Sequence, residues 1–323
     1  MNVRHLFVIN PVAGKTDRTE SVKRAVGELG LNEPYDFAVT ECKGDASIKA
    51  RDYILAHPDD FVRVYACGGD GTLCETAEGV YASGSKSCAL GVLPIGSGND
   101  FVKYFDSHGD AFGSLEALTG GRYCAVDMIS ITDDDGQSRI GLNIISAGFD
   151  AAIAKGMDKF KSIPFVNGSM AYNLSLVSCL LKKTKNYFYI YTDGHEAGKG
   201  NGPYLFAIAA NGRFYGGGFE AAPYSDISDG LIDFISVDTV PKPKIPVLVG
   251  KFRAGRHIEE LKQYVTYHRC CEMKLVSDSM IDLNVDGEIV PTKNPVMRIL
   301  PSALNLIIPA NGVTTDKTAL ING

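Results

Sequence analysis

The first third of the chain alternates short apolar runs with longer segments that carry apolar residues on one helical face. The runs predict buried strands, and the segments between them predict helices. The expected strands are His5–Ile9, Tyr35–Thr40, Phe61–Ala66 and Ala89–Leu93. The expected helices are Thr16–Leu29, Asp45–His57, one that begins near Thr72 and a short one that ends near Phe105. This alternation predicts a Rossmann-like α/β domain with a parallel sheet covered on both faces.

From about Cys124 the pattern changes to short strands separated by turn residues. Asp-Gly pairs at 135–136, 193–194, 229–230 and 286–287 are typical of tight turns. The expected strands are Val126–Thr132, Ser138–Ile144, Tyr187–Thr192, Tyr204–Ala209, Ile232–Val237, Glu272–Val276, Ile281–Val285, Met297–Leu300 and Ala303–Pro309. Helices are expected at Ser169–Lys183 and Ile245–Tyr264. We therefore expect an α/β domain of residues 1–124 with the tail from about 302 to 323, and a mainly antiparallel β-sandwich domain of residues 125–301.

Composition and charge exclude several classes of protein. The 323-residue chain has a formal net charge of −6, and a nucleic-acid surface needs a clustered basic footprint, so we expect no nucleic-acid partner. No apolar run approaches the roughly 18 residues of a membrane span. The first residues lack the apolar core and cleavage site of a signal peptide. The eight cysteines include no Cys-x-x-Cys pair, which favours reduced thiols in a cytoplasmic protein.

Three glycine-bearing turns follow strands of the first domain, namely Asn10–Lys15, Gly68–Thr72 and Gly96–Asp100. Glycine lets the backbone turn sharply and approach a ligand, and the start of the following helix offers N–H groups to a phosphate. Each turn alone could serve only packing, and Asn99 or Asp100 could simply cap the next helix. Because the carboxyl ends of parallel strands share one edge of a sheet, the three turns together predict a nucleotide or phosphate site around the Asp70 carboxylate.

Two later turns carry carboxylates that have both a structural and a functional interpretation. Asp229-Gly230 is a plain turn, or it supplies hard oxygen ligands for Mg²⁺. Asp286-Gly287, between two alternating strands, is a strong hairpin signal that needs no function to explain it. A carboxylate at a rigid hairpin tip could equally be the base of a phosphoryl transfer. Spacing alone does not decide between these interpretations.

A basic segment lies between positions 241 and 258. It holds Lys242, Lys244, Lys251, Arg253 and Arg256 among apolar residues, without an acidic residue. Such a segment can lie on an anionic membrane surface. The alternative, which is the commoner case, is a helix that packs its apolar side and leaves its charges in water.

In their order and spacing, these motifs resemble the catalytic family of diacylglycerol kinases, and specifically the soluble bacterial lipid kinases that are similar to sphingosine kinases. The motifs are the Asn10–Gly14 turn, Gly68–Thr72, Gly96–Asp100, Asn143 with residues 148–150, Pro223 with Asp229-Gly230, and Asp286–Glu288. They span nearly the whole chain. The resemblance implies an ATP- and Mg²⁺-dependent kinase that phosphorylates the hydroxyl of a lipid such as diacylglycerol. The lipid would enter between the two domains, the protein would dock reversibly on the membrane surface, and a homodimer is compatible with this.

The resemblance also implies roles for single residues. ATP would be bound by Asn10, Gly14, Thr40, Gly69, Gly71, Thr72, Glu75, Gly96, Ser97 and Asn99. Asp70 would organise the phosphates and the catalytic Mg²⁺, and Asp286, with Glu288 beside it, would be the general base. Asp229, with the carbonyls of Asp226 and Leu231, would hold a second, structural Mg²⁺. Three residues depart from the usual family pattern, namely Ser97 in place of Thr, Lys103 in place of Arg and Ser225 in place of Ala.

Two other functions stay open. NAD kinases and phosphofructokinases have turns similar to Gly68–Thr72, so an NAD kinase or a sugar-phosphate kinase is the alternative enzyme. A non-catalytic nucleotide- or lipid-binding protein would be marked by the loss of a carboxylate at 70, 286 or 288. All three carboxylates are present.

Overall fold

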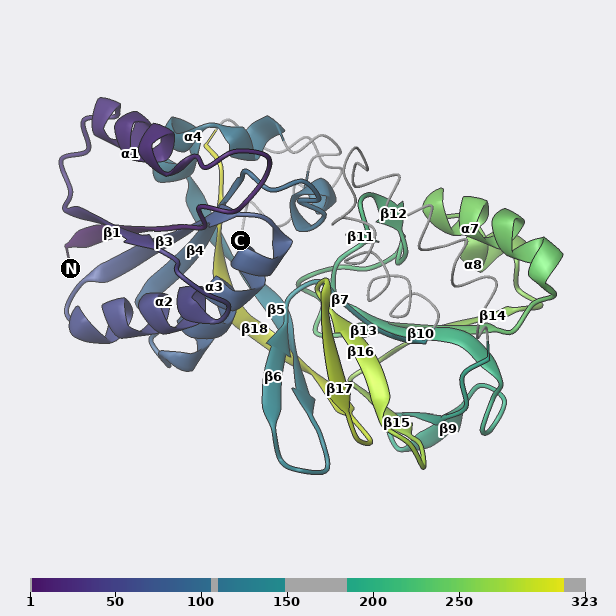
Figure 1. The fold of residues 1–323 in the computed structure, drawn as a ribbon. Coiled ribbons are helices and arrows are strands. Elements are labelled where there is room, and N and C mark those ends of the chain that lie inside the picture. Colours follow the sequence, from purple (N-terminus) through teal and green to yellow (C-terminus); the bar gives the residue numbers. More distant parts are fainter. Residues whose placement is uncertain (1, 106–109, 149–184, 311–323) are drawn as a thin grey trace. The chain divides into compact units, whose positions relative to one another are not determined.

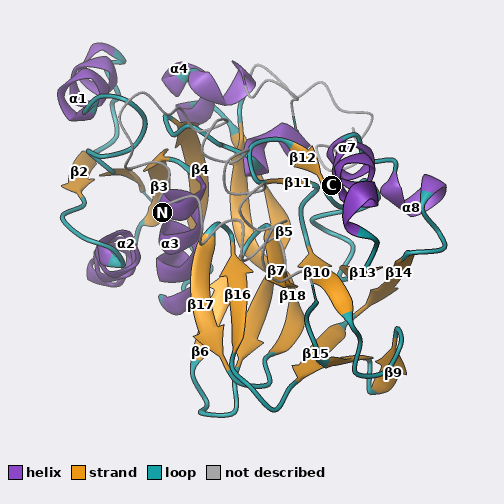
Figure 2. Ribbon diagram, turned by 45° about the vertical axis from the view of Figure 1, so that its right-hand side comes forward, coloured by secondary structure: helices purple, strands orange, loops and turns teal. Residues whose placement is uncertain are grey.

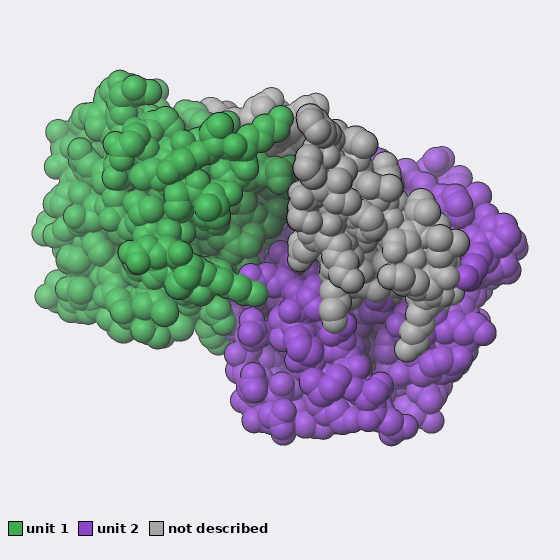
Figure 3. All heavy atoms as spheres, viewed as in Figure 1, with its two compact units in different colours: residues 1–126, 302–323 green, residues 127–301 purple. Residues whose placement is uncertain are grey.

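The computed structural model describes residues 2–105, 110–148 and 185–310 (Figure 1). The chain divides into two compact units, residues 1–126 with 302–323, and residues 127–301 (Figure 3). Two strands, β5 (Arg122–Thr132) and β18 (Val296–Ile308), contribute residues to both units. The helix expected at Ser169–Lys183 lies outside the described residues.

The first unit is built on a parallel sheet. Its strands are β1 (Val3–Ile9), β2 (Tyr35–Val39), β3 (Phe61–Gly68) and β4 (Cys88–Pro94), in the order β2-β1-β3-β4, with the end of β18 beside β4. Every one of these pairings is parallel. The predicted α/β arrangement is confirmed, and the three glycine turns follow β1, β3 and β4 at one edge of this sheet.

Helices cover both faces of the parallel sheet. Figure 1 shows α1 (Thr19–Glu28) on one face, and α2 (Asp45–Ala56) and α3 (Asp70–Ala82) on the other. Helix α1 buries Val22 and Val26, which lie one turn apart and therefore on one side of the helix. Two 3₁₀ turns, η1 (Phe101–Tyr104) and η2 (Asp110–Gly113), and the short helix α4 (Leu115–Thr119) lead into β5.

The second unit consists of two antiparallel layers (Figure 2). One layer has the order β14 (Val265–Cys270), β13 (Ile232–Asp238), β10 (Tyr204–Ala210), β7 (Ile144–Gly148), β16 (Ile281–Val285) and β17 (Glu288–Thr292). The other layer joins β18 to β15 (Glu272–Val276), β8 (Tyr189–Thr192) and β9 (His195–Ala197), and joins β5 to β6 (Ser138–Gly141). Side chains of both layers, including Phe234 and Met273, form one apolar core. The predicted β-sandwich is confirmed.

The outer face of the six-stranded layer is also covered. Helices α7 (Ile245–Arg253) and α8 (His257–Glu260) follow the 3₁₀ turn η3 (Lys242–Lys244) and pack on this face. Every residue of β10 is buried, because alternate side chains enter the cores on the two faces of the layer. Within the described ranges no helix is long and apolar enough to cross a membrane.

Four predicted elements are divided or joined in the structure. The strand expected at Ser138–Ile144 is two strands, because the backbone between them turns to bind Asp286. The helix expected at Ile245–Tyr264 is two helices, separated at Gly255, whose φ of 66° is left-handed. The two strands expected at the end of the chain are one, β18. Strand β14 follows this broken helix and was not predicted.

Candidate functional site

The three glycine turns of the first unit contact one another. Asn10 Nδ2, after β1, donates a hydrogen bond to Thr72 Oγ1 at 2.9 Å. A Cβ atom on Gly96 would lie only 2.4 Å from Gly69 Cα, and one on Gly69 would lie 3.3 Å from Gly96 Cα, so the close approach of the two turns requires glycine at position 96. Gly14 has a φ of 80°, and a Cβ atom there would lie 2.6 Å from the Ile95 carbonyl oxygen. The predicted convergence of the turns is therefore confirmed.

The N-terminus of α3 lies at the centre of these turns. Its N-cap residue, Gly69, has an extended backbone, and no side chain caps the helix. The first N–H groups of a helix have no partner within the helix, and the helix dipole makes this end partly positive. An anion such as a phosphate group is the natural partner for such an end.

Asp70 joins the start of α3 to the third turn. Its Oδ1 accepts a hydrogen bond from the N–H of Phe101 at 3.2 Å. Gly98 allows this approach, because a Cβ atom there would lie 2.9 Å from Asp70 Oδ2. Lys103 Nζ donates to the Gly98 carbonyl at 2.8 Å and to Asp100 Oδ1 at 2.5 Å. The lysine thus stabilises the same turn.

The surroundings of Asp70 change the pKa of its carboxyl group. Burial disfavours the charged form and is the main reason why the pKa of this carboxyl is raised to about 6, and the nearby negative charge of Asp100 adds to the effect. The N–H groups of Phe101 and Asp100 and the charge of Lys103 act in the opposite direction. Perturbed carboxylates in such places are candidates for functional residues.

Asn99 shows two signs of a functional residue. Its φ of 51° is left-handed, a conformation that non-glycine residues adopt at a cost. Its Nδ2 donates to the Gly96 carbonyl at 2.9 Å, while its buried Oδ1 has no hydrogen-bond partner among the described residues. A buried acceptor without a partner is costly, so a donor on a ligand would stabilise it.

The other predicted nucleotide-binding residues are not part of this contact network. Thr40 is buried just after β2, where its N–H donates to the Ile9 carbonyl at 2.9 Å. Gly71 and Glu75 are in α3, and Ser97 is exposed in the third turn.

The carboxylate of Asp286, in the second unit, is held by backbone N–H groups. Its Oδ2 accepts from Leu142 at 2.7 Å, and its Oδ1 accepts from Asn143 at 3.0 Å and from Ile144 at 2.8 Å. Asp286 lies at the tip of the β16–β17 hairpin with a left-handed φ of 49°, and Glu288 begins β17. The hydrogen bonds fix the orientation of the carboxylate and also give it a structural role. The hairpin interpretation is therefore confirmed, while the catalytic role stays a prediction.

Asp229 precedes β13 in the same unit. Its Oδ1 accepts from the N–H of Leu231 at 3.1 Å, and its Oδ2 lies 3.4 Å from Arg269 Nη1. Burial raises the pKa of the Asp229 carboxyl, and the negative charges of Asp226 and Asp233 raise it further, against the effects of Leu231 and Arg269. Three carboxylates therefore lie near one another here, and the positive charge of Arg269 partly balances them.

Three residues around this carboxylate were not singled out from the sequence, namely Asp233, Tyr267 and Arg269. Asp233 is fully buried and accepts from the Tyr267 hydroxyl at 2.7 Å, with Arg269 at 3.7 Å. Tyr267 and Arg269 both lie in β14. Only the pairing of β13 with β14 brings them to this position, and the sequence offers no local signal for it.

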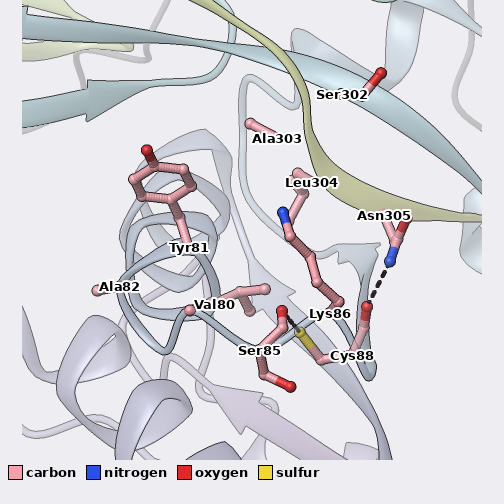
Figure 4. Close-up of a pocket in the computed structure, with 11 residues that line it drawn as sticks. Val80, Tyr81, Ala82, Ser85, Lys86, Cys88, Ser302, Ala303, Leu304 and Asn305 are labelled. Atoms are coloured by element: carbon pink, nitrogen blue, oxygen red, sulfur yellow. Dashed lines mark hydrogen bonds between the residues drawn. The ribbon is translucent and has the colours of Figure 1, made fainter.

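A cavity of about 440 Å³ lies at the other end of α3 (Figure 4). It is lined by Val80, Tyr81, Ala82, Gly84, Ser85, Lys86, Cys88, Ser302, Ala303, Leu304 and Asn305. Helix α3 has 13 residues and begins at the glycine turns, so the cavity is roughly 18 Å from them at about 1.5 Å per residue. The cavity is therefore not part of the candidate nucleotide site.

Comparison with known proteins agrees with this arrangement. Residues 4–131 match the family model of the diacylglycerol kinase catalytic domain, and residues 143–308 match the YegS C-terminal NAD kinase beta sandwich-like domain. A relative from Chromohalobacter salexigens, named "Probable lipid kinase YegS-like", is 28% identical over 92% of this chain and 91% of its own. A diacylglycerol kinase of Mycobacterium tuberculosis is 24% identical, with 94% of both chains covered.

The fold is shared with solved structures. A diacylglycerol kinase from Bacillus anthracis superposes with a TM-score of 0.66 at 17% identity, covering 96% of this chain and 98% of the other. The two family models follow one another along the chain and match most of it. The chain therefore belongs to the diacylglycerol kinase family of lipid kinases, with the kinase catalytic domain followed by the YegS-type C-terminal domain.

Proposed function

We propose that this protein transfers the γ-phosphate of ATP to the hydroxyl group of a membrane lipid such as diacylglycerol. The observation that carries the proposal is the close approach of Gly69 and Gly96, which brings two turns together beside the uncapped start of α3. Backbone N–H groups at such a helix start bind phosphate groups. Phosphoryl transfer depends mainly on positioning and charge neutralisation, which glycine turns and a few carboxylates can supply.

In this proposal the first unit binds ATP and the second supplies the base. The three turns and the start of α3 hold the phosphates, and Asp70 would hold the catalytic Mg²⁺ that neutralises part of their charge. Lys103 keeps the third turn in shape, because its ammonium group is already bound to Gly98 and Asp100. Asp286 takes the proton from the lipid hydroxyl, and its three N–H partners keep the carboxylate in one orientation.

The residues around Asp229 fit a structural Mg²⁺. The donor set is entirely oxygen, the carboxylate of Asp229 and the carbonyls of Asp226 and Leu231, which suits a hard cation that keeps several waters. Burial is the main reason why the pKa of the Asp229 carboxyl is raised, and the negative charges of Asp226 and Asp233 add to the effect, so a cation beside this carboxylate would stabilise its charged form. No cluster of three or more acidic, histidine or cysteine side chains suited to a metal occurs in the described part of the chain. The proposed ligand set contains only one such side chain, Asp229, because its other protein ligands are backbone carbonyls. The ion would supply positive charge that stabilises the loop before β13.

Adding Mg²⁺ to the purified protein should raise the melting temperature, because a ligand that binds only the folded state stabilises it by RT ln(1 + [L]/Kd), about 2.7 kcal/mol at a hundredfold excess over Kd. Asp229→Asn should remove this shift. Asp226→Asn should keep it, because the proposed ligand there is the carbonyl. The melting temperature is measured by calorimetry with and without Mg²⁺. Equal shifts in the wild type and Asp229→Asn would exclude Asp229 as a ligand.

The function itself is tested by a direct assay. The protein is incubated with labelled ATP and, in separate reactions, with extracted membrane lipids, with NAD and with a sugar phosphate, and products are identified by mass. We expect a phosphorylated lipid only. The NAD reaction is included because the matching C-terminal family is described as NAD kinase beta sandwich-like. A phosphorylated NAD, or no product with any acceptor, would contradict the proposal.

A further inference from the structure

The segment from 241 to 258 differs in charge from the rest of the chain. It carries five Lys and Arg residues and no Asp or Glu, in a chain with a formal net charge of −6. The structure folds this segment into η3, α7 and the start of α8, on the outer face of the six-stranded layer (Figure 1). A local excess of positive charge therefore lies on one surface element of the second unit.

The two sides of α7 are both poor in charge. Ile245, Leu248 and Phe252 are buried in the core beneath the helix. The opposite side consists of Pro246, Val247 and Gly250, with Ala254 just after the helix, all exposed, and we call these four residues the α7 outer face; Arg253 borders it. Val247 is 59% exposed. A helix that only meets water normally carries charged residues at the centre of its outer side, and this one carries none there.

Cations border the α7 outer face. Two of them form ion pairs with a carboxylate of α8, and the other three lie at the two ends of the helix. Lys251 and Arg256 both form ion pairs with Glu260 of α8, so their charges are balanced. Lys242 and Lys244 precede the helix at its exposed N-terminal end, and Lys244 Nζ lies 3.0 Å from the Tyr264 hydroxyl. Arg253 is exposed at the other end, with its guanidinium 5.6 Å from the centre of the Phe219 ring.

We propose that the α7 outer face, with Lys242, Lys244 and Arg253 around it, is the surface by which the protein docks on an anionic lipid bilayer. An apolar centre with cations at its edges is the pattern of a helix that lies in a membrane interface. The cations are attracted by the negative lipid headgroups, and Val247 enters the boundary with the acyl chains. This inference rests on the proposed lipid-kinase function, because a substrate held in a bilayer requires such contact.

The first test measures binding to vesicles without ATP, so that it does not depend on catalysis. Wild-type protein and the variant Lys242→Glu/Lys244→Glu/Arg253→Glu are sedimented with vesicles of phosphatidylcholine containing 30% phosphatidylglycerol. At about 1 kcal/mol for each cation at the surface, the variant should bind at least about a hundredfold more weakly. The matched control is Lys86→Glu/Arg122→Glu/Arg139→Glu, which makes the same change in net charge at exposed residues of other elements, and it should bind within about threefold of the wild type.

The second test asks whether the occupant is a bilayer or another polyanion. Val247→Ser should weaken vesicle binding roughly tenfold, because it removes apolar contact, and should leave binding to heparin unchanged. An equal affinity of Val247→Ser and wild type for vesicles, or a control triple as weak as the Lys242/Lys244/Arg253 triple, would overturn the proposal. The proposal would also be overturned if the wild type were a dimer and Val247→Ser dissociated it, because the α7 outer face would then bind a second copy of the chain.

Failure of this inference can be told apart from failure of the proposed function. On a short-chain diacylglycerol below its micellar concentration, the Lys242/Lys244/Arg253 triple should phosphorylate at a rate within about twofold of wild type. If the docking surface is wrong, vesicle binding of the triple is normal while wild type still phosphorylates lipid. If the function is wrong, wild type phosphorylates no lipid although its vesicle binding is lost in the triple.

Discussion

Replacing Asp286 by asparagine should lower lipid phosphorylation roughly 10²–10⁴-fold, the usual contribution of a general base. The same change should also destabilise the second unit. Asparagine has one carbonyl oxygen in place of two carboxylate oxygens, so at least one of the N–H groups of Leu142, Asn143 and Ile144 loses its acceptor. A buried donor without a partner costs about 1–3 kcal/mol. Both effects follow from one side chain.

The two effects are separated by measuring several quantities on the same variants. Turnover is compared with the free energy of unfolding in urea and with the Kd for ATP, which Asp286→Asn should leave within about threefold of wild type. The matched control is Asn284→Ala, which removes the oxygen that accepts from the Gly287 N–H at 2.9 Å and keeps the carboxylate. We expect the control to lose stability and to keep turnover within about tenfold. Equal losses of turnover in the two variants would show that the hairpin, and not the base, is what Asp286 provides.

The glycine turns could be predicted from the sequence because each depends on neighbouring residues. An apolar strand, a glycine turn and an amphipathic helix are all encoded locally. The parallel sheet then places the ends of β1, β3 and β4 at one edge, and general rules of α/β folds are sufficient for that step. The network of Asn10, Thr72, Gly69 and Gly96 follows from this placement.

The surroundings of the two later carboxylates could not be predicted in the same way. Asp286 binds the N–H of Ile144 across a separation of 142 positions in the chain. Leu142 lies between Gly141 and Asn143, and these two residues alone do not show that the backbone turns there to reach a hairpin far along the chain. Likewise Arg269 meets Asp229 only because β14 pairs with β13. Contacts of this kind depend on the tertiary fold and have no local sequence pattern.

The variant Gly96→Ala should bind ATP roughly 10- to 100-fold more weakly than the wild type. A Cβ atom at this position would lie 2.4 Å from Gly69 Cα, 3.0 Å from Gly69 N and 2.9 Å from Asn99 Oδ1. Carbon atoms pack at about 3.5–4.0 Å, so the turns after β3 and β4 must separate by roughly 1 Å. Such a displacement breaks N–H hydrogen bonds to the charged phosphates, each worth about 1.5–3 kcal/mol, and the loss of one such bond lowers the affinity for ATP by roughly 10- to 100-fold. The N–H groups of Ile95 and Gly96, which donate to the Gly68 carbonyl at 2.9 and 3.1 Å, would move as well.

ATP binding is measured by calorimetric titration, with circular dichroism as a check that the variant is folded. Gly27→Ala in α1 is the matched control, because a Cβ atom there meets no atom within 4 Å. This control should bind ATP normally and gain about 0.5–1 kcal/mol in stability, since alanine favours a helix over glycine. If a folded Gly96→Ala variant bound ATP within threefold of wild type, the nucleotide could not lie on these turns. The close approach of Gly69 and Gly96 would then serve packing alone, and the proposed function would lose the observation on which it rests.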